Sequence, residues 1–206
     1  YEKVIVLRED YKDAYKNLAI VHLKLKNHDT ALEFASKALV IDNTDYQIHY
    51  IMGTAYTAKK EYEKAVASLL EGLKLKPDHA LMYNNLGSCY LALKMIKEAQ
   101  EAFEKAVELD NSNATSYYNL ATALQLQQKH KEAFEYFKKS YEIEPSEFYL
   151  SAAAVGSINA ESWHNAIVYY QKLIIAHPEK QNFQYNLATA YQQTGKYNEA
   201  DRKSVV

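Results

Sequence analysis

The sequence has few of the features of disulfide-rich proteins, of proteins with glycine-rich phosphate loops or of membrane-spanning proteins. Its 206 residues include one cysteine, Cys89, so an internal disulfide is excluded and a reducing compartment, the cytoplasm, is expected. Only five glycines are present, none of them in a phosphate-binding loop, and no nucleophile motif is visible. No apolar run approaches the roughly 18 residues of a membrane-spanning helix, so direct membrane insertion is not expected.

Charge and histidine spacing exclude further classes of protein. Lys and Arg number 24 against 26 Asp and Glu, a net charge of −2 that disfavours a nucleic-acid partner. The seven histidines form no His-x-x-x-His pair and no cluster with cysteine, so we predict no metal, no cofactor and no catalytic site. The chain begins at Tyr1 rather than Met, and we expect a fragment whose targeting segments are missing.

What the chain does contain is a repeat. The hexapeptide YNLATA starts at Tyr118 and again at Tyr185, 67 residues apart, which is one step of 34 and one of 33. The same pattern recurs along the whole chain, so we predict a single array over residues 1–206. Residues 1–11 end a truncated repeat, full repeats cover 12–45, 46–79, 80–113, 114–146 and 147–180, and an incomplete repeat covers 181–206.

Each unit contains two helical patterns. Apolar or small residues stand at places four, seven, eight and eleven of a unit, the spacing of one side of a helix. A second run has alanine at place twenty and a large residue at place twenty-four, as with Leu69 and Phe103. The three prolines, Pro77, Pro145 and Pro178, all fall at place thirty-two, where they end the second helix.

These residues resemble the tetratricopeptide repeat family. The clearest matches are YNNLGSCY…AQEAFEKAVELD from Tyr83 and YYNLATAL…AFEYFKKSYEIEP from Tyr117. The resemblance implies an all-α, right-handed superhelix of about six helix-turn-helix repeats. The fifth unit departs from the signature with SAAAVGS. There we expect either a thin or short first helix that bends the array, or ordinary drift compensated by the larger Trp163, Tyr169 and Tyr170.

The first helix of each unit also carries an uncharged side. Places two, five, six, nine, twelve and thirteen lie opposite the packing side, and we call them the first-helix face. In the second to sixth units these thirty positions hold no charged residue, although the chain is 24% charged and about seven would be expected. A concave binding groove explains the pattern, and packing between neighbouring first helices is the alternative at places five, nine and twelve.

Asparagine recurs at place six of this face, at Asn17, Asn85, Asn119 and Asn186. An amide offers donors and an acceptor, so a row of them can hold the main chain of an extended peptide. The row resembles the asparagine ladder in the repeat arm of O-linked N-acetylglucosamine transferase and, more loosely, that of kinesin light chain. Packing or drift is the alternative, and Ile51 and Ala152 interrupt the row. The full predicted peptide-binding set adds Tyr50, Thr54, Asn84, Ser88, Tyr118, Thr122, Tyr185 and Thr189.

The predicted function is non-catalytic protein binding. A carboxylate clamp of the kind that binds chaperone tails is not expected, because Lys16 stands at place five but Ile20 follows at place nine. Base-by-base RNA reading needs a basic surface that this chain lacks. Two alternatives remain open: a substrate-recruiting arm of a larger enzyme such as that glycosyltransferase, and self-association through exposed solenoid ends.

Overall fold

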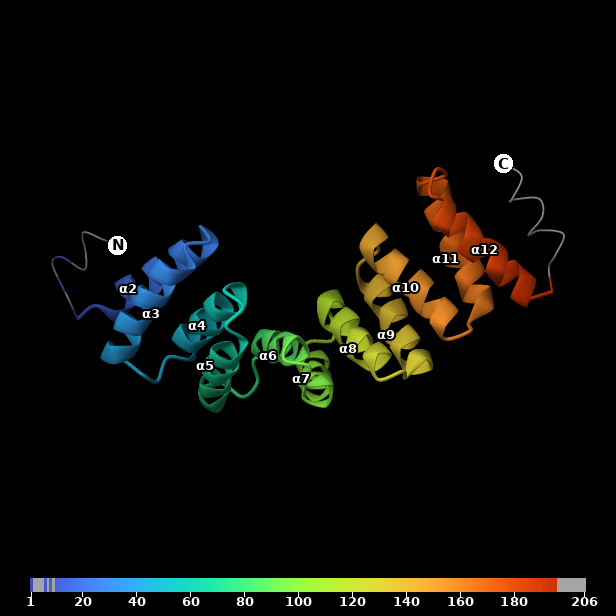
Figure 1. The fold of residues 1–206 in the computed structure, drawn as a ribbon. Helices are drawn as coiled ribbons and strands as arrows, with labels where there is room; N and C mark the ends of the chain where they lie inside the picture. Colours follow the sequence, from blue (N-terminus) through green and yellow to red (C-terminus); the bar gives the residue numbers. More distant parts are fainter. Residues whose placement is uncertain (2–5, 7, 9, 196–206) are drawn as a thin grey trace. The chain divides into compact units, whose positions relative to one another are not determined.

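The computed structural model describes residues 1, 6, 8 and 10–195, and this part of the chain consists of α-helices joined by short turns (Figure 1). The helices of 13 residues alternate with helices of 14 residues. They are α2 (Lys12–Lys24), α3 (His28–Ile41), α4 (Tyr46–Ala58), α5 (Tyr62–Leu75), α6 (Ala80–Ala92), α7 (Ile96–Leu109), α8 (Ala114–Leu126), α9 (His130–Ile143), α10 (Glu147–Asn159), α11 (Trp163–Ala176) and α12 (Gln181–Gln193).

Consecutive helices form pairs. α2 packs on α3, α4 on α5, α6 on α7, α8 on α9 and α10 on α11. The predicted all-α fold of helix pairs is therefore confirmed. The second helix of the sixth unit and most of the predicted repeat end at 1–11 lie outside the described residues.

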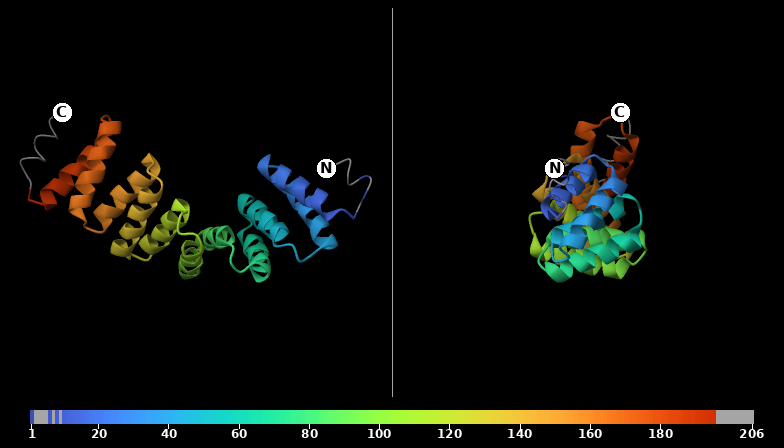
Figure 2. Two further views of the ribbon diagram at one scale, coloured as in Figure 1. Left: turned by 180° about the vertical axis from the view of Figure 1, so that it is seen from behind. Right: turned by 90° about the vertical axis from the view of Figure 1, so that its left-hand side faces the viewer.

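The chain divides into two compact units, which we describe separately. The N-terminal unit, Tyr1–Asn111, holds α2 to α7, and the C-terminal unit, Ser112–Val206, holds α8 to α12. Within each unit, successive helix pairs also contact one another, through α3 with α4, α5 with α6 and α9 with α10. The left view in Figure 2 shows this side-by-side arrangement of pairs inside each unit.

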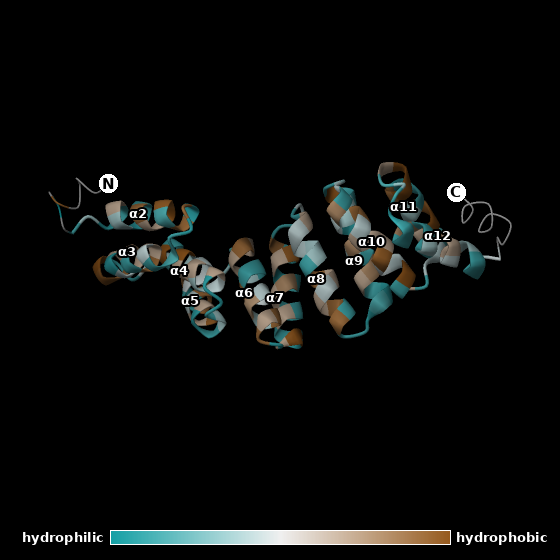
Figure 3. Ribbon diagram, turned by 45° about the horizontal axis from the view of Figure 1, so that its top comes forward, coloured by the Kyte–Doolittle hydropathy of each residue, from teal (hydrophilic) through white to brown (hydrophobic). Residues whose placement is uncertain are grey.

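Glycine at place eight allows the two helices of a pair to approach closely. A Cβ atom added to Gly87 would lie 2.6 Å from the ring of Phe103, which is itself fully buried. Gly53 faces Leu69 in the same way, again at 2.6 Å. Each helix carries both hydrophobic and hydrophilic residues (Figure 3). A small residue at place eight therefore packs against a large one at place twenty-four in these two pairs.

In the turn between paired helices, a residue other than glycine adopts the left-handed backbone conformation. Five such residues have φ between 57° and 63°, namely Lys26, Lys60, Lys94, Gln128 and Glu161. After α6, the Met95 amide donates to the Tyr90 carbonyl at 2.9 Å, and the Lys94 amide to the Leu91 carbonyl at 3.0 Å. These are the two hydrogen bonds of a Schellman motif, which ends the helix and reverses the chain.

The unusual fifth unit has a complete first helix. α10 spans 13 residues, as the other first helices do, so the expected shortening is wrong. Tyr169 and Tyr170 of α11 are buried, and their ring contacts are with Phe134 and Tyr141 of α9 and with Phe183 of α12. Compensation for the small residues by these larger ones stays a prediction.

Candidate functional site

The first-helix face of the N-terminal unit is a half-buried polar surface on α4 and α6. The Asn85 amide donates across neighbouring repeats to the Thr54 hydroxyl oxygen, at a long 3.4 Å. The Thr54 hydroxyl donates to the Tyr50 carbonyl at 2.8 Å, and the Ser88 hydroxyl donates to the Asn84 carbonyl at 2.9 Å. The hydroxyl protons are thus used within each helix, and the hydroxyl oxygens can still accept.

On α8 and α12 of the C-terminal unit, the threonine hydroxyls make the same hydrogen bonds within each helix. The Thr122 hydroxyl donates to the Tyr118 carbonyl at 2.9 Å, and the Thr189 hydroxyl to the Tyr185 carbonyl at 3.0 Å. The Asn186 amide donates to the Tyr170 hydroxyl at 3.0 Å.

The four asparagines of the row are all half-buried, two in each compact unit. Asn85 and Asn186 each donate one hydrogen bond within the protein. This is the packing role that was the alternative to peptide binding for this row. An amide has two donors and an acceptor with two lone pairs, so one hydrogen bond does not use its capacity. The interruption at Ile51 is a buried apolar residue, 3% exposed.

The tyrosines at place five differ from one another. Tyr50 lies beside the His79 ring, with centroids 5.4 Å apart. Tyr118 packs on Phe148 at 4.8 Å and on Phe137 at 5.6 Å. Tyr185 is 74% exposed. Packing therefore explains the positions of Tyr50 and Tyr118, and Tyr185 is the most exposed of the three.

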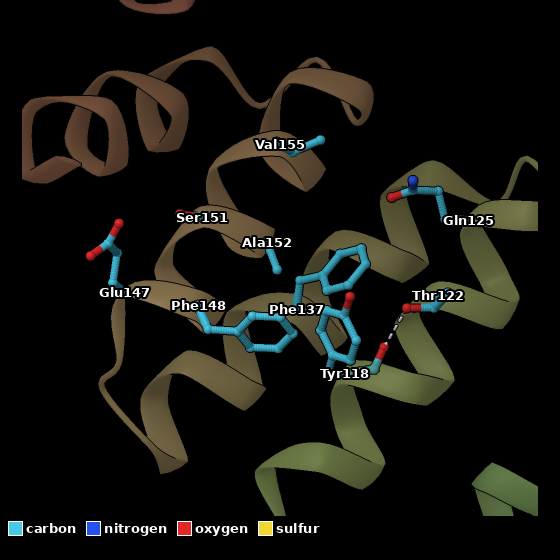
Figure 4. A pocket seen from close by; sticks show the side chains of 9 residues that line it. All are labelled: Tyr118, Thr122, Gln125, Phe137, Glu147, Phe148, Ser151, Ala152 and Val155. Atoms are coloured by element: carbon cyan, nitrogen blue, oxygen red, sulfur yellow. Dashed lines mark hydrogen bonds between the residues drawn. The ribbon is translucent and has the colours of Figure 1, made fainter. Parts of the chain in front are cut away.

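A hollow of about 700 Å³ opens in front of Tyr118, between α8 and α10 (Figure 4). Its floor is aromatic, and its outer rim includes Phe148 and Val155, which are 58% and 48% exposed. The residues that line it are Tyr118, Thr122, Gln125, Phe137, Glu147, Phe148, Ser151, Ala152 and Val155. Most of them belong to the predicted uncharged face, but the hollow itself was not predicted.

Glu147 is the charged residue at this hollow, and its charge is already matched. Its carboxylate lies 2.8 Å from His177 Nε2 and 3.3 Å from Lys180 Nζ. Hydrogen bonding to His177 and Lys180 holds the pKa of the Glu147 carboxyl below its usual value. In Figure 4 its side chain points away from the aromatic floor, so the hollow presents neutral groups to a partner.

Lys16, at the place where a carboxylate clamp would begin, is engaged within the protein. Its ammonium group lies 2.8 Å from the Asp45 carboxylate and 2.9 Å from the Gln47 amide oxygen. Neighbouring Lys12 pairs with Asp42 at 2.7 Å. These ion pairs tie α2 to the turn before α4.

His79 is a structural residue that the sequence did not reveal. It precedes α6, and its Nδ1 accepts a hydrogen bond from the Met82 amide at 3.2 Å, which caps the helix. Its ring lies against Tyr46 and Tyr50, with centroids 5.5 and 5.4 Å away. Burial lowers the pKa of His79, because the charged imidazolium is poorly solvated there.

We therefore expect stability to fall as His79 is protonated. Its pKa is lower in the folded chain than the ordinary value of about 6.5, so the unfolded state binds the proton first and unfolding is favoured as the pH falls. Between about pH 7.5 and about pH 5.5, the thermal midpoint should drop more for the wild type than for His79→Asn, which keeps a capping oxygen. Equal drops in the two proteins, measured by circular dichroism, would contradict this assignment.

The described residues offer little for catalysis or metal binding. They contain no group of three or more His, Cys, Asp or Glu residues placed to hold a metal ion. The Cys89 thiol is buried, lies 3.1 Å from the Thr57 hydroxyl, and has its pKa raised by burial, so it is held protonated. Across the described residues, every helix is too short or too polar to cross a bilayer.

Comparison with known families identifies the repeat. Tetratricopeptide repeat models match residues 78–146 and 182–202, and a TPR repeat model matches residues 53–94. FK506-binding protein 5 from Rhizopus delemar is 40% identical over 58 residues, which is 28% of this chain. The matched segment covers only 15% of that protein, so the likeness concerns the repeats and not the whole of it.

Solved structures share the fold. MamA is 26% identical with a TM-score of 0.67, over 70% of this chain and 85% of its own. YrrB, described as a TPR protein with an unusual peptide-binding site, is 22% identical with a TM-score of 0.74, over 89% and 95%. PilF of Pseudomonas aeruginosa is 20% identical with the same TM-score, over 96% and 90%. The likeness of the asparagine row to one glycosyltransferase arm stays a prediction, because these matches concern the repeat in general.

Proposed function

Because the chain is a tetratricopeptide repeat protein, we propose that it is a non-catalytic interaction scaffold that binds an extended segment of a partner protein along its first-helix faces. The fold alone supports the coarser part of this proposal, since stacked helix pairs present long surfaces to partners. The same fold in YrrB carries a peptide-binding site. The single cysteine fits a reducing compartment such as the cytoplasm.

The observation that carries the finer part is the separation of charge between the two helices of a pair. The second helices carry exposed ion pairs between residues three positions apart, for example Lys74 with Glu71 on α5 and Lys105 with Glu108 on α7. The first-helix faces from the second repeat onward carry amides, hydroxyls, aromatic rings and aliphatic side chains instead. A solvated helix face with no binding role has no need to avoid charge.

The chemistry of the face favours recognition through the partner's main chain. Asn85 and Asn186 retain donor and acceptor capacity beyond the single hydrogen bonds to Thr54 and Tyr170. An extended peptide presents one N–H and one C=O per residue, which such amides can pair with irrespective of sequence. We therefore propose binding with broad sequence tolerance, in which side-chain pockets add selectivity.

Recognition without ion pairs should be insensitive to salt. The dissociation constants of fluorescein-labelled peptides of about 12 residues are expected to change by less than about twofold between about 50 and about 500 mM sodium chloride. Fluorescence anisotropy measures this directly, and a peptide of the same composition in scrambled order should bind with a similar dissociation constant. A steep loss of affinity with salt would show that charges outside the first-helix faces dominate the binding.

A further inference from the structure

The hollow between α8 and α10 stands where the asparagine row is broken. In the N-terminal unit, Asn85 of α6 reaches Thr54 of the preceding first helix. The corresponding positions in the C-terminal unit are Ala152 of α10 and Thr122 of α8, and both line the hollow. Alanine has no amide, so the contact made by Asn85 has no counterpart here and the space is left open.

Place five of α10 also carries a smaller side chain than the same place in other units. Place five carries tyrosine in three units, at Tyr50, Tyr118 and Tyr185, but serine at Ser151. The absence of a ring at Ser151 and of an amide at Ala152 uncovers the Tyr118 ring beneath. The other break in the row behaves differently, because Ile51 is buried and occupies its own space. The break at Ala152 coincides with a hollow of about 700 Å³.

We propose that this hollow is a side-chain pocket that accepts one bulky apolar residue, aromatic or branched aliphatic, of the bound segment. The inference rests on the proposed function, and adds the class of residue that the face selects. The rings of Tyr118 and Phe137 on the floor and of Phe148 at the rim suit stacking and apolar contact. Glu147 is matched by His177 and Lys180, so a charged side chain would lose hydration without gaining a partner.

The exposed apolar residues at the rim also favour a bulky apolar side chain as the occupant. Phe148 and Val155 are 58% and 48% exposed on one face of α10, and a partner side chain seated between them would remove apolar surface from water. The volume falls within the range of about 300–1,000 Å³ that is usual for ligand pockets. It accommodates a large side chain together with the adjoining main chain of the segment.

The test uses anisotropy with labelled peptides of about 12 Gly, Ser, Thr and Asn residues that carry one guest residue, Phe, Leu, Ala, Lys or Asp. The full chain is expected to bind the Phe and Leu guests about tenfold more tightly than the others. Ser151→Tyr restores the ring found at this place in three other units, and should reduce that preference to about twofold while the Ala guest binds as before. Ala152→Asn, which restores the amide, is a second filling variant.

His164→Tyr is the matched control, because His164 is exposed on α11, a second helix, and does not line the hollow. It should keep the tenfold preference. If the peptides bind but Ser151→Tyr and Ala152→Asn, both folded by circular dichroism, leave the preference unchanged, the pocket is disproved and the scaffold function stands. Equal binding of all guests by the wild type has the same meaning. If no peptide binds, the proposed function fails and the pocket with it.

Discussion

Replacing Phe103 with alanine is expected to lower the free energy of unfolding by about 3–5 kcal/mol. The ring is fully buried in α7 and packs against Gly87 of α6, where an added Cβ would lie 2.6 Å away. Because the residue opposite is glycine, no side chain is present there to move into the cavity. The loss should therefore lie at the large end for a buried aromatic residue.

Urea denaturation followed by circular dichroism measures this loss, and hydrogen exchange shows whether α6 and α7 open first. Repeat arrays can unfold in parts, so local protection complements the global midpoint. Phe148→Ala is the matched control, since Phe148 is 58% exposed and its truncation should cost about 0.5 kcal/mol. Similar losses for the two variants would mean that glycine at place eight does not position the core.

The sequence predicts the helices well because the repeat records their packing. Alanine, glycine and large apolar residues recur at fixed places because each helix pair packs in the same way. Gly87 against Phe103 was foreseeable from two places of a single unit. The first helices begin at Lys12, Tyr46 and Ala80, the first residues of three marked units, because the pattern repeats without insertion there.

The features that escaped prediction depend on more than one unit or on backbone conformation. Lys94 adopts a φ of 63° in a turn where glycine would be the signal, and only Gly195 of the sixth unit supplies that signal. His79 caps α6 through a ring nitrogen, which is not a usual capping group. The hollow at Ala152 is formed by side chains of α8, α9 and α10 together, so the sequence of a single unit does not predict it.

Truncating the asparagine row should have the largest effect on function. Asn85→Ala combined with Asn119→Ala is expected to weaken binding of an extended peptide by about 10- to 100-fold, as each lost amide removes hydrogen bonds worth about 0.5–1.5 kcal/mol apiece. Asn85 makes a long hydrogen bond to Thr54 and Asn119 also has a partner, so circular dichroism must first show that the double variant is folded. Asn43→Ala with Asn111→Ala is the matched control, since both residues are exposed in turns.

The most direct test of main-chain recognition is the dissociation constant of one selected peptide for the wild type, this double variant and its control, under one set of conditions. We predict a loss of at least about tenfold for the Asn85 and Asn119 variant and no change for the Asn43 and Asn111 variant. An unchanged dissociation constant in a folded Asn85 and Asn119 variant would contradict the role of the amide row in binding.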